Sequence, residues 1–291
     1  MPEQPPPTAA GLGHWLASHP PRARFRAWVA EADDGVAGFA TAELHWSSTV
    51  AGVGWWWAGV REYARGRGLG HALVEAAEDH LVGEGMRKLE TMALVESAGE
   101  RLLEARGYVR SRTELVLSLA VAEADLSALS ALEAAKRAEG FRAVPLGEVA
   151  DRKRELHVLY AAASEDVPAD DPDDDIRFED FETHVMGDPE LTLDGSVVVL
   201  HGERPVSLAF VLVDHEAGAA LSEMTGTLPE YRGRGLARLA KLAAIRSARE
   251  AGVRRLVTDN DSENAAMLGL NRSLGYRVTH ERALLARGVP G

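Results

Sequence analysis

A glycine- and arginine-rich segment occurs twice in this chain, and each copy runs directly into an apolar segment with helical spacing. The first copy, residues 65–70, reads RGRGLG, and the second, residues 232–237, reads RGRGLA. A second landmark also repeats, as RGY ending at Tyr108 and LGY ending at Tyr276, and its two copies are one residue further apart than the two loops. A long and nearly constant spacing indicates duplication of a whole domain, not a solenoid of short repeats.

The length of the chain suits two domains. Its 291 residues, of which 46% are hydrophobic and 26% are charged, supply enough apolar material for two cores of a soluble globular protein. We predict an N-terminal domain at residues 1–138 and a C-terminal domain at residues 139–291, joined by a helical segment at 123–140. Few residues precede the first predicted strand, so we expect the N-terminal copy to be truncated or degenerate, without the opening strand and long helix of the other copy, or to have its first strand replaced.

Composition and charge exclude several classes of protein. A net charge of −13 disfavours binding to a nucleic-acid backbone, which depends on Lys and Arg neutralising phosphates. The absence of cysteine excludes disulfides, thiolate metal sites and cysteine nucleophiles, and we expect no metal. No apolar run reaches the roughly 18 residues of a membrane span. Residues 1–15 are rich in proline and are expected to be a disordered lead-in, not a secretory signal. These features favour a cytoplasmic protein without membrane or nucleic-acid partners.

Both copies show the same coarse order of secondary structure. In the first copy we predict strands at residues 24–31, 35–44, 52–60, 87–95 and 113–121 and helices at residues 70–85 and 97–108. In the second copy we predict strands at residues 141–149, 217–228, 254–260 and 276–286, a hairpin at 196–214, and helices at 152–164, 233–252 and 262–275. An acidic loop at residues 165–175 contains seven Asp or Glu and no basic residue.

The glycine–arginine segments lie after a strand and at the start of a helix, which is typical of a phosphate site. A helix N-terminus presents unpaired N–H groups and the positive end of the helix dipole, glycines allow a ligand to approach closely, and arginine binds phosphate in a bidentate manner. A dinucleotide fingerprint would need glycine in place of His71 or Arg238, and neither copy contains the Gly-Lys-Ser/Thr of a Walker A loop. The segments therefore predict a different diphosphate site, and the alternative is a turn with solvated charges.

The remaining pattern, R-x-x-G-x-G/A, resembles the loop of the GNAT superfamily of acyl-CoA-dependent N-acetyltransferases, and the resemblance covers almost the whole chain as two units. It implies an α/β fold of the mixed α+β kind, with two tandem GNAT-like domains, each a twisted, mixed and largely antiparallel sheet flanked by helices. It also implies that the loops bind the pyrophosphate of coenzyme A, with acetyl-CoA as co-substrate. The cofactor-binding residues implied are Val60, Arg65, Gly66, Arg67, Gly68, Leu69 and Gly70 in the first copy and Thr227, Leu228, Arg232, Gly233, Arg234, Gly235, Leu236, Ala237 and Asn264 in the second.

The resemblance also assigns positions in the later segment of each copy. In the family an Asn of the helix contacts the cofactor; that position matches Asn264 in the second copy and, counted back from the glycine, Glu96 in the first. Asn264 can equally be a helix-start residue. The family's tyrosine acid lies seven residues later, where this chain has Asn271 and Leu103. Neither side chain can give a proton to a departing thiolate. Tyr276 is therefore the candidate acid, and a core position is the alternative.

A base is also needed, because the acceptor amine must lose its proton. Glu223 lies in the strand before the second loop, where the family often has a catalytic glutamate; partial burial would raise the pKa of its carboxyl group. The alternative is an exposed strand residue. The first copy has Trp56 at this position, in a run of three tryptophans that indicates a core or a filled site. The backbone N–H of Thr227 matches the family's donor to the thioester carbonyl.

We therefore expect an N-acetyltransferase that moves an acetyl group from acetyl-CoA directly to a primary amine of a small molecule or peptide. The second copy would be catalytic, and the first structural or regulatory, a plan that resembles the mycothiol synthases. The alternative is a non-catalytic acyl-CoA-binding sensor, which the missing tyrosine favours. The acidic loop occupies the place of the family's acceptor-facing loop, where it either attracts a cationic amine or is simply solvated.

Overall fold

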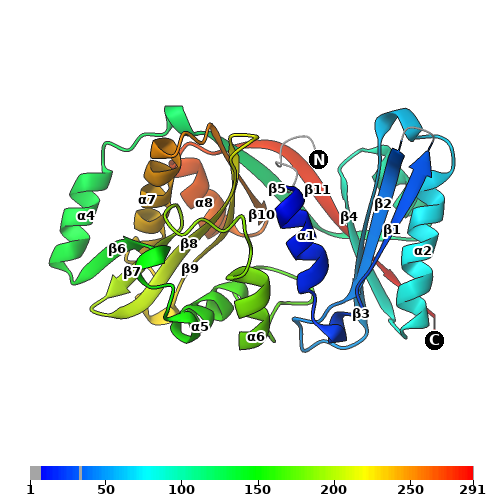
Figure 1. Cartoon of the computed structure of the whole chain (residues 1–291), viewed down its shortest axis with the longest axis horizontal. Coiled ribbons are helices and arrows are strands. Elements are labelled where there is room, and N and C mark those ends of the chain that lie inside the picture. The colour runs from blue at the N-terminus through cyan, green and yellow to red at the C-terminus, as the bar shows by residue number, and fades with distance from the viewer. Residues whose placement is uncertain (1–7, 33–34, 291) are drawn as a thin grey trace. The chain divides into compact units, whose positions relative to one another are not determined.

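The computed structural model of the chain describes residues 8–32 and 35–290 (Figure 1). The helices are α1 Ala9–Ser18, α2 Leu69–Gly83, α3 Ala98–Ala105, α4 Leu129–Ala138, α5 Lys153–Ser164, α6 Phe178–Asp180, α7 Leu236–Glu250 and α8 Ala265–Ser273. The strands are β1 Arg26–Ala32, β2 Gly35–Leu44, β3 Val53–Val60, β4 Lys88–Leu94, β5 Val109–Ala120, β6 Phe141–Pro145, β7 Val197–His201, β8 Arg204–Asp214, β9 Ala219–Thr227, β10 Arg255–Asp261 and β11 Arg277–Gly288. Short helical turns are η1 Pro21–Ala23, η2 Glu62–Ala64, η3 Val121–Glu123, η4 Leu146–Glu148, η6 Pro229–Tyr231 and the π-helical turn η5 Phe181–Val185. The predicted mixed α/β fold is confirmed.

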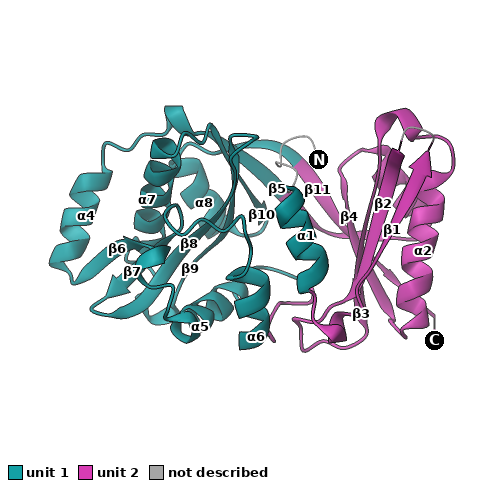
Figure 2. Cartoon of the chain, in the orientation of Figure 1, with its two compact units in different colours: residues 1–18, 115–169, 176–280 teal, residues 19–114, 170–175, 281–291 magenta. Residues whose placement is uncertain are grey.

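The chain divides into two compact units whose segments interleave along the sequence (Figure 2). Unit 1 comprises residues 1–18, 115–169 and 176–280, and unit 2 comprises residues 19–114, 170–175 and 281–291. The strand order is β5-β10-β9-β8-β7-β6 in unit 1 and β1-β2-β3-β4-β11 in unit 2. The last strand of each copy is thus exchanged, since β5 lies beside β10 and β11 pairs antiparallel with β4. A boundary between residues 138 and 139 remains our proposal for where the repeated copies meet.

The duplication read from the sequence is visible element by element. Helices α2 and α7 both have 15 residues, strands β4 and β10 both have seven, and strands β5 and β11 both have 12. Helix α8 has nine residues and α3 has eight, so the spacing between equivalent residues of the two copies grows by one inside this helix. The one extra residue that separates the second pair of sequence landmarks therefore lies in helix α8.

Helix α1 corrects one expectation from the sequence. The disorder expected for residues 1–15 is wrong for residues 9–15, which are helical; residues 1–7 lie outside the described residues. The carboxylate of Glu190 accepts a hydrogen bond of 2.6 Å from the N–H of Thr8, immediately before the helix. A carboxylate at this place satisfies an N-terminal donor and complements the helix dipole. The helix is stabilised by a residue 182 positions away, which a local reading of the sequence does not detect.

The core of unit 1 lies around its central strands. Strands β7 and β8 are buried along almost their whole length, with α7 packed against both and α5 packed against β8 and β9. Strands that are covered on both faces need apolar residues at successive positions, which accounts for the runs VVVL and SLAFVLV. In unit 2, helix α2 packs against β1, β2 and β3.

A buried ion-pair cluster ties the exchanged strand β11 into unit 2. The carboxylate of Glu78 in α2 accepts two hydrogen bonds from Arg106, at 3.2 and 2.6 Å, and lies 3.1 Å from Nη2 of Arg287 in β11. The Arg287 guanidinium also lies 4.9 Å from the centre of the Tyr108 ring. Burial opposes ionisation of Glu78, but the hydrogen bonds from Arg106 and the charge of Arg287 lower its pKa.

Replacing Glu78 with Gln is expected to lower the free energy of unfolding at pH 7 by about 2–3 kcal/mol, because two cations lose their buried partner. A carboxyl group whose pKa is lower in the folded state stabilises the protein above its unfolded-state pKa, and this contribution is lost as the pH falls through the folded-state value. Urea unfolding of both proteins between pH 7 and pH 3 should therefore show a difference that shrinks with acidification. A difference that is independent of pH would contradict this assignment.

Candidate active site

The two glycine–arginine loops have the same main-chain conformation. Gly66 and Gly68 have φ angles of 74° and 84°, and Gly233 and Gly235 have φ angles of 72° and 73°. This left-handed region favours glycine because a Cβ atom is strained there. Each loop follows a 3-10 turn, and Gly68 and Gly235 are the N-caps of α2 and α7, without a side-chain capping bond. The first N–H groups of both helices are therefore directed at the loop, as an anion site requires.

The first arginine of each loop folds back onto the preceding strand. Nε of Arg65 donates to the carbonyl of Val60 at 3.1 Å, and Nε of Arg232 donates to the carbonyl of Thr227 at 3.2 Å. The Arg232 guanidinium also pairs with Asp166, whereas no ion pair of Arg65 is found within the described residues. The guanidinium groups of both arginines are exposed beside the helix N-terminus, although in the second loop an anion must compete with a carboxylate.

The other predicted loop residues lie in three environments. Arg67 and Arg234 are exposed, and the Arg234 guanidinium lies 5.7 Å from the centre of the Tyr231 ring. Leu236 is buried in the core, and Leu69, Gly70 and Ala237 are half-buried in the first helical turns. Leu228 is also buried; its N–H donates to Val206 and its carbonyl accepts from Tyr231, so both of its main-chain groups are already hydrogen bonded.

In both copies the strand before the loop separates from the next parallel strand. Strand β9 pairs with β10 at three positions ending at Leu221↔Val257, although β9 continues to Thr227. Strand β3 pairs with β4 at three positions ending at Trp55↔Glu90 and continues to Val60. Beyond these positions the main-chain ladder between the two strands ends in both copies.

The second copy has a β-bulge that the first copy lacks. The pairs of β8 and β9 on either side of the irregularity are Ala209↔Thr225 and Val211↔Ser222. Two residues of β9, one of them Glu223, therefore face a single residue of β8. Strand β3 pairs with β2 without such a shift. A bulge redirects a side chain and leaves part of the ladder unpaired, and bulges are frequent beside active sites.

Glu223 carries the most unusual carboxyl group of this region. Its Oε1 accepts a hydrogen bond of 2.8 Å from the hydroxyl of Tyr160 in α5, and its Oε2 is buried without a partner among the described residues. Burial raises the pKa of Glu223 to about 7, opposed by the Tyr160 hydrogen bond and assisted by the charges of Asp188 and Asp259. A carboxylate that changes its ionisation near neutral pH is suited to act as a general base. The sequence analysis missed Tyr160, whose only signal is a hydroxyl on the apolar face of a helix.

The equivalent position of the first copy has no ionisable group. Trp56 is buried there, its Nε1 donates to the Tyr108 hydroxyl at 2.8 Å, and the two rings pack edge to face. These two rings fill the space next to β3, in line with the interpretation of the three tryptophans as bulk.

Tyr276, the candidate acid, is a core residue with 3% of its surface exposed. Burial raises the pKa of its phenol, opposed by a hydrogen bond with Ser222, so it holds its proton more tightly than an ordinary tyrosine. Beside it lies Lys241 of α7, which the sequence analysis also missed. Its signal is a single cationic residue inside the apolar run LAKLAAI.

Asn264 is the N-cap of α8, where its Oδ1 accepts from the N–H of Met267 at 3.1 Å. In the first copy Ser97 has this place, so the count that set Glu96 opposite Asn264 is wrong by one residue. The count is wrong because helix α3 is one residue shorter than α8.

Asn271 is fully buried and its Nδ2 donates to Oδ1 of Asn260 at 2.6 Å. Its own Oδ1 has no partner within the described part of the chain. The position of the family's tyrosine therefore holds a buried amide in this copy.

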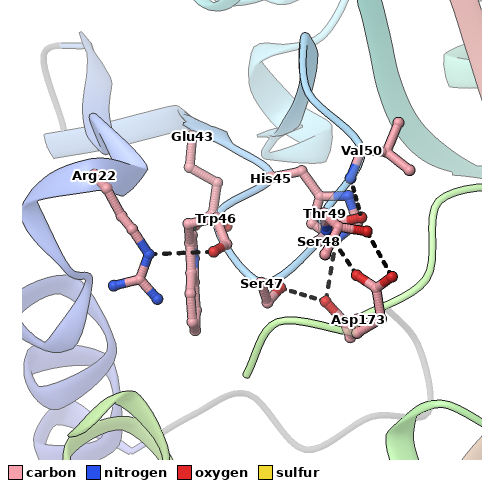
Figure 3. A network of polar contacts seen from close by, with 10 residues as sticks. Arg22, Glu43, His45, Trp46, Ser47, Ser48, Thr49, Val50 and Asp173 are labelled. Atoms are coloured by element: carbon pink, nitrogen blue, oxygen red, sulfur yellow. Dashed lines mark hydrogen bonds and ion pairs between the residues drawn. The ribbon is translucent and has the colours of Figure 1, made fainter. Parts of the chain in front are cut away.

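The acidic loop is held by hydrogen bonds and ion pairs within unit 2. The carboxylate of Asp173 is bonded to His45 and Ser47, as Figure 3 shows, and the adjacent Asp174 is bonded to the main chain and hydroxyl of Thr49. Asp171 pairs with Lys88, and Asp170 lies 3.7 Å from Arg112. These four carboxylates already have partners on the protein, which weakens the expectation that they attract a cationic amine.

Membrane-spanning helices and metal sites complete the description of the candidate functional features. Among residues 8–32 and 35–290, no helix is long and apolar enough to cross a membrane. Within that described part, no group of three or more His, Asp or Glu side chains is placed to hold a metal ion.

Solved structures of other proteins share the fold of this chain. A GCN5-related N-acetyltransferase from Sphaerobacter thermophilus superposes with a TM-score of 0.64 at 18% identity, over 91% of this chain and 81% of its own. A tandem GNAT protein from the clavulanic acid biosynthesis pathway superposes with a TM-score of 0.75 at 20% identity, over 98% of this chain and 90% of its own. No curated protein sequence matched. The sequence model described as the acetyltransferase (GNAT) family matches residues 2–108 and 154–276. The two matches together cover well over half of the chain, one in each copy, and the protein therefore belongs to the GNAT family of acetyltransferases.

Proposed function

We propose that the protein transfers an acetyl group from acetyl-CoA to a primary amine by direct attack, and that the second copy, residues 139–291, catalyses the transfer. The observation that carries this proposal is the carboxyl group of Glu223, which lies at a bulge shortly before Thr227, has a buried oxygen without a partner among the described residues and has a pKa near 7. The first copy has Trp56 at that position and no base.

The proposed reaction assigns one task to each part of the second copy. The loop and the N-terminus of α7 hold the diphosphate of acetyl-CoA, which supplies the thioester, and the separated edge of β9, including the Thr227 N–H, aligns its extended arm. The lone pair of the neutral amine attacks the thioester carbonyl carbon, and Glu223 accepts the proton that the attacking nitrogen loses. The tetrahedral intermediate then collapses, the C–S bond breaks with its electron pair going to sulfur, and CoA leaves. A form "without AcCoA" is described for the tandem GNAT protein of similar fold, which supports acetyl-CoA as donor.

A second function, an acyl-CoA-binding sensor without turnover, is favoured by one observation. The family's tyrosine position holds Asn271, and an amide cannot give up a proton. We place either function in the cytoplasm, with a small-molecule or peptide amine as acceptor for the enzyme.

The two functions are separated by measuring CoA release from acetyl-CoA in the presence of a panel of primary amines, with calorimetric titration of acetyl-CoA in parallel. Turnover with any amine supports the enzyme. Binding of acetyl-CoA without turnover for the whole panel supports the sensor. A protein that binds no acetyl-CoA would contradict both functions.

The matched loops allow each proposed donor site to be removed separately. A Cβ atom at Gly68 or Gly235 would meet nothing within 4 Å, and aspartate tolerates the left-handed region better than most residues. Gly68→Asp and Gly235→Asp should each place a carboxylate at one diphosphate position and weaken binding there at least about tenfold. We expect two sites of comparable affinity for the wild type, and one unchanged and one weakened site for each variant. Loss of turnover only in Gly235→Asp would support the second copy as the catalytic one, and equal loss in both would contradict it.

A further inference from the structure

Lys241 is a buried amine that the proposed reaction does not yet use. It lies in α7 with 2% of its surface exposed, and its Nζ donates to the Oγ of Ser222 at 3.0 Å. Its Nζ lies 5.2 Å from the centre of the Tyr276 ring. No carboxylate pairs with it among the described residues, and burial alone lowers its pKa to about 7. A buried lysine without an anionic partner destabilises a fold and therefore requires another explanation.

The amine contacts the sheet at the point where β9 and β10 separate. Ser222 is the first residue of β9 beyond the paired positions, and its carbonyl accepts a hydrogen bond of 3.1 Å from the hydroxyl of Thr258 in β10. Successive side chains of a strand point to opposite faces of the sheet. Ser222 meets Lys241 of α7, whereas the next residue, Glu223, meets Tyr160 of α5. The cationic group and the carboxyl group thus lie on opposite faces of one strand, next to each other in sequence.

The first copy provides an internal comparison. In the alignment that sets the two glycine–arginine loops on each other, Val74 takes the place of Lys241 and is also buried, with 3% of its surface exposed. Trp55 and Trp56 take the places of Ser222 and Glu223. An apolar residue therefore packs well at this position of the fold. Lysine, serine and glutamate occur together in one copy and are replaced together in the other, which links the amine to the task of the second copy.

We propose that Lys241 acts through the Ser222 hydroxyl to supply the proton that the CoA sulfur takes up when it leaves, in the role that a tyrosine has elsewhere. This inference rests on the proposed function. As the C–S bond breaks, its electron pair goes to sulfur, the sulfur takes the Ser222 proton, and Ser222 takes a proton from the Lys241 ammonium. The amine is left neutral and recovers a proton from solvent before the next turnover. Lys241 is thus a positioning residue, and Ser222 is the group that would touch the leaving sulfur.

The acidities of the groups agree with this direction of transfer. An ordinary thiol has a pKa of about 8.5, so an ammonium group with a pKa near 7 is the stronger acid. Burial then favours the neutral amine that is formed. No charged side chain among the described residues faces Lys241, and the phenol of Tyr276 beside it stays protonated because burial raises its pKa. The groups that face Glu223 are Tyr160, Asp188 and Asp259.

The test is the pH dependence of CoA release, with hydroxylamine as a small acceptor probe. In the wild type we expect a narrow bell, with a rising limb as Glu223 loses its proton and a falling limb as Lys241 loses its own. Lys241→Met and Ser222→Ala should lower kcat about 100-fold, leave the KM for acetyl-CoA within about threefold, and abolish the falling limb. Lys241→Arg keeps the charge above pH 9 and should also lose that limb. Val74→Met, at the matched position of the first copy, should leave rate and profile unchanged.

Each outcome decides one question. Unchanged kcat and an unchanged falling limb in Lys241→Met, with a shifted unfolding temperature, would overturn the role of Lys241 and leave the acetyltransferase standing. If the wild type binds acetyl-CoA but releases no CoA with hydroxylamine or any amine of the panel, the proposed function fails and the inference fails with it. If Lys241→Met does not fold, Lys241→Val, which copies the buried residue of the first copy, replaces it in the same assay.

Discussion

Glu223→Gln is expected to reduce the rate of CoA release by roughly 10²–10⁴ while acetyl-CoA binds as tightly as before. Glutamine keeps the shape of the side chain and can still accept the Tyr160 hydrogen bond, but it cannot take a proton from an amine. Because burial raises the pKa of Glu223 to about 7, the wild-type rate should rise as the pH approaches about 7 and the carboxylate forms, which is the rising limb of the bell. The variant should lose this rising limb. Stopped assays of free thiol over this pH range, with calorimetric titration of acetyl-CoA, measure both quantities.

Two further variants test the assignment of Glu223 as the base. Tyr160→Phe removes the hydrogen bond that lowers the pKa of Glu223, so the rising limb should move to higher pH and the bell should become narrower and lower. Trp56→Phe, at the matched position of the first copy, removes the bond to Tyr108 and part of the ring packing there, and should leave the rate unchanged. If Glu223→Gln retains the wild-type rate and profile, the base lies elsewhere.

Gly226→Ala is expected to destabilise the protein by about 2–4 kcal/mol. A Cβ atom at Gly226 would lie 2.2 Å from the Cβ atom of Ala163 and 3.1 Å from its Cα atom, where α5 crosses β9. Both of these atoms are fixed by the helix backbone, so the clash is relieved only if α5 moves away from the strand. The same helix carries Tyr160, and the variant should therefore also lose activity. Urea unfolding at pH 7 measures the first effect.

The first copy again provides a matched control. At Gly59, a Cβ atom would first meet the Phe39 ring at 3.6 Å, an ordinary van der Waals distance. Gly59→Ala should therefore change the free energy of unfolding by less than about 1 kcal/mol. Equal losses in the two variants would show that strand glycines matter here for a reason other than the approach of α5.

The sequence predicts local features of this protein well and long-range features poorly. Spacing within one strand–loop–helix unit locates the loop glycines and the strand that contains Glu223. This spacing is the same in both copies, which also reveals their tandem order. The contacts of Tyr160 and Lys241 depend on which helix lies on which face of β9, which no local pattern specifies. Helix α1 was not predicted for the same reason, because the carboxylate of Glu190 beside its N-terminus is remote in sequence.

The contacts of the acidic loop and the positions of strands β5 and β11 could not be predicted from the sequence for a different reason. Seven carboxylates without a basic residue look like a solvated segment, but the cations and hydroxyls that bind four of them come from β4, β5 and the loop after β2. The exchange of β5 and β11 could not be predicted either, because both strands begin with mostly polar, exposed residues and continue with a buried apolar segment, so either strand suits either sheet.

The exchanged strand β11 also determines when the protein can finish folding during synthesis. Strand β4 is complete at Leu94, but the segment of β11 that pairs with it begins at Arg282, so an edge of the sheet stays open while everything between these two positions is still being translated. Open strand edges invite pairing with other chains, and ribosomes add about 5–20 residues per second. The nascent chain therefore exposes β4 for many seconds, and chaperone engagement should be concentrated in that interval.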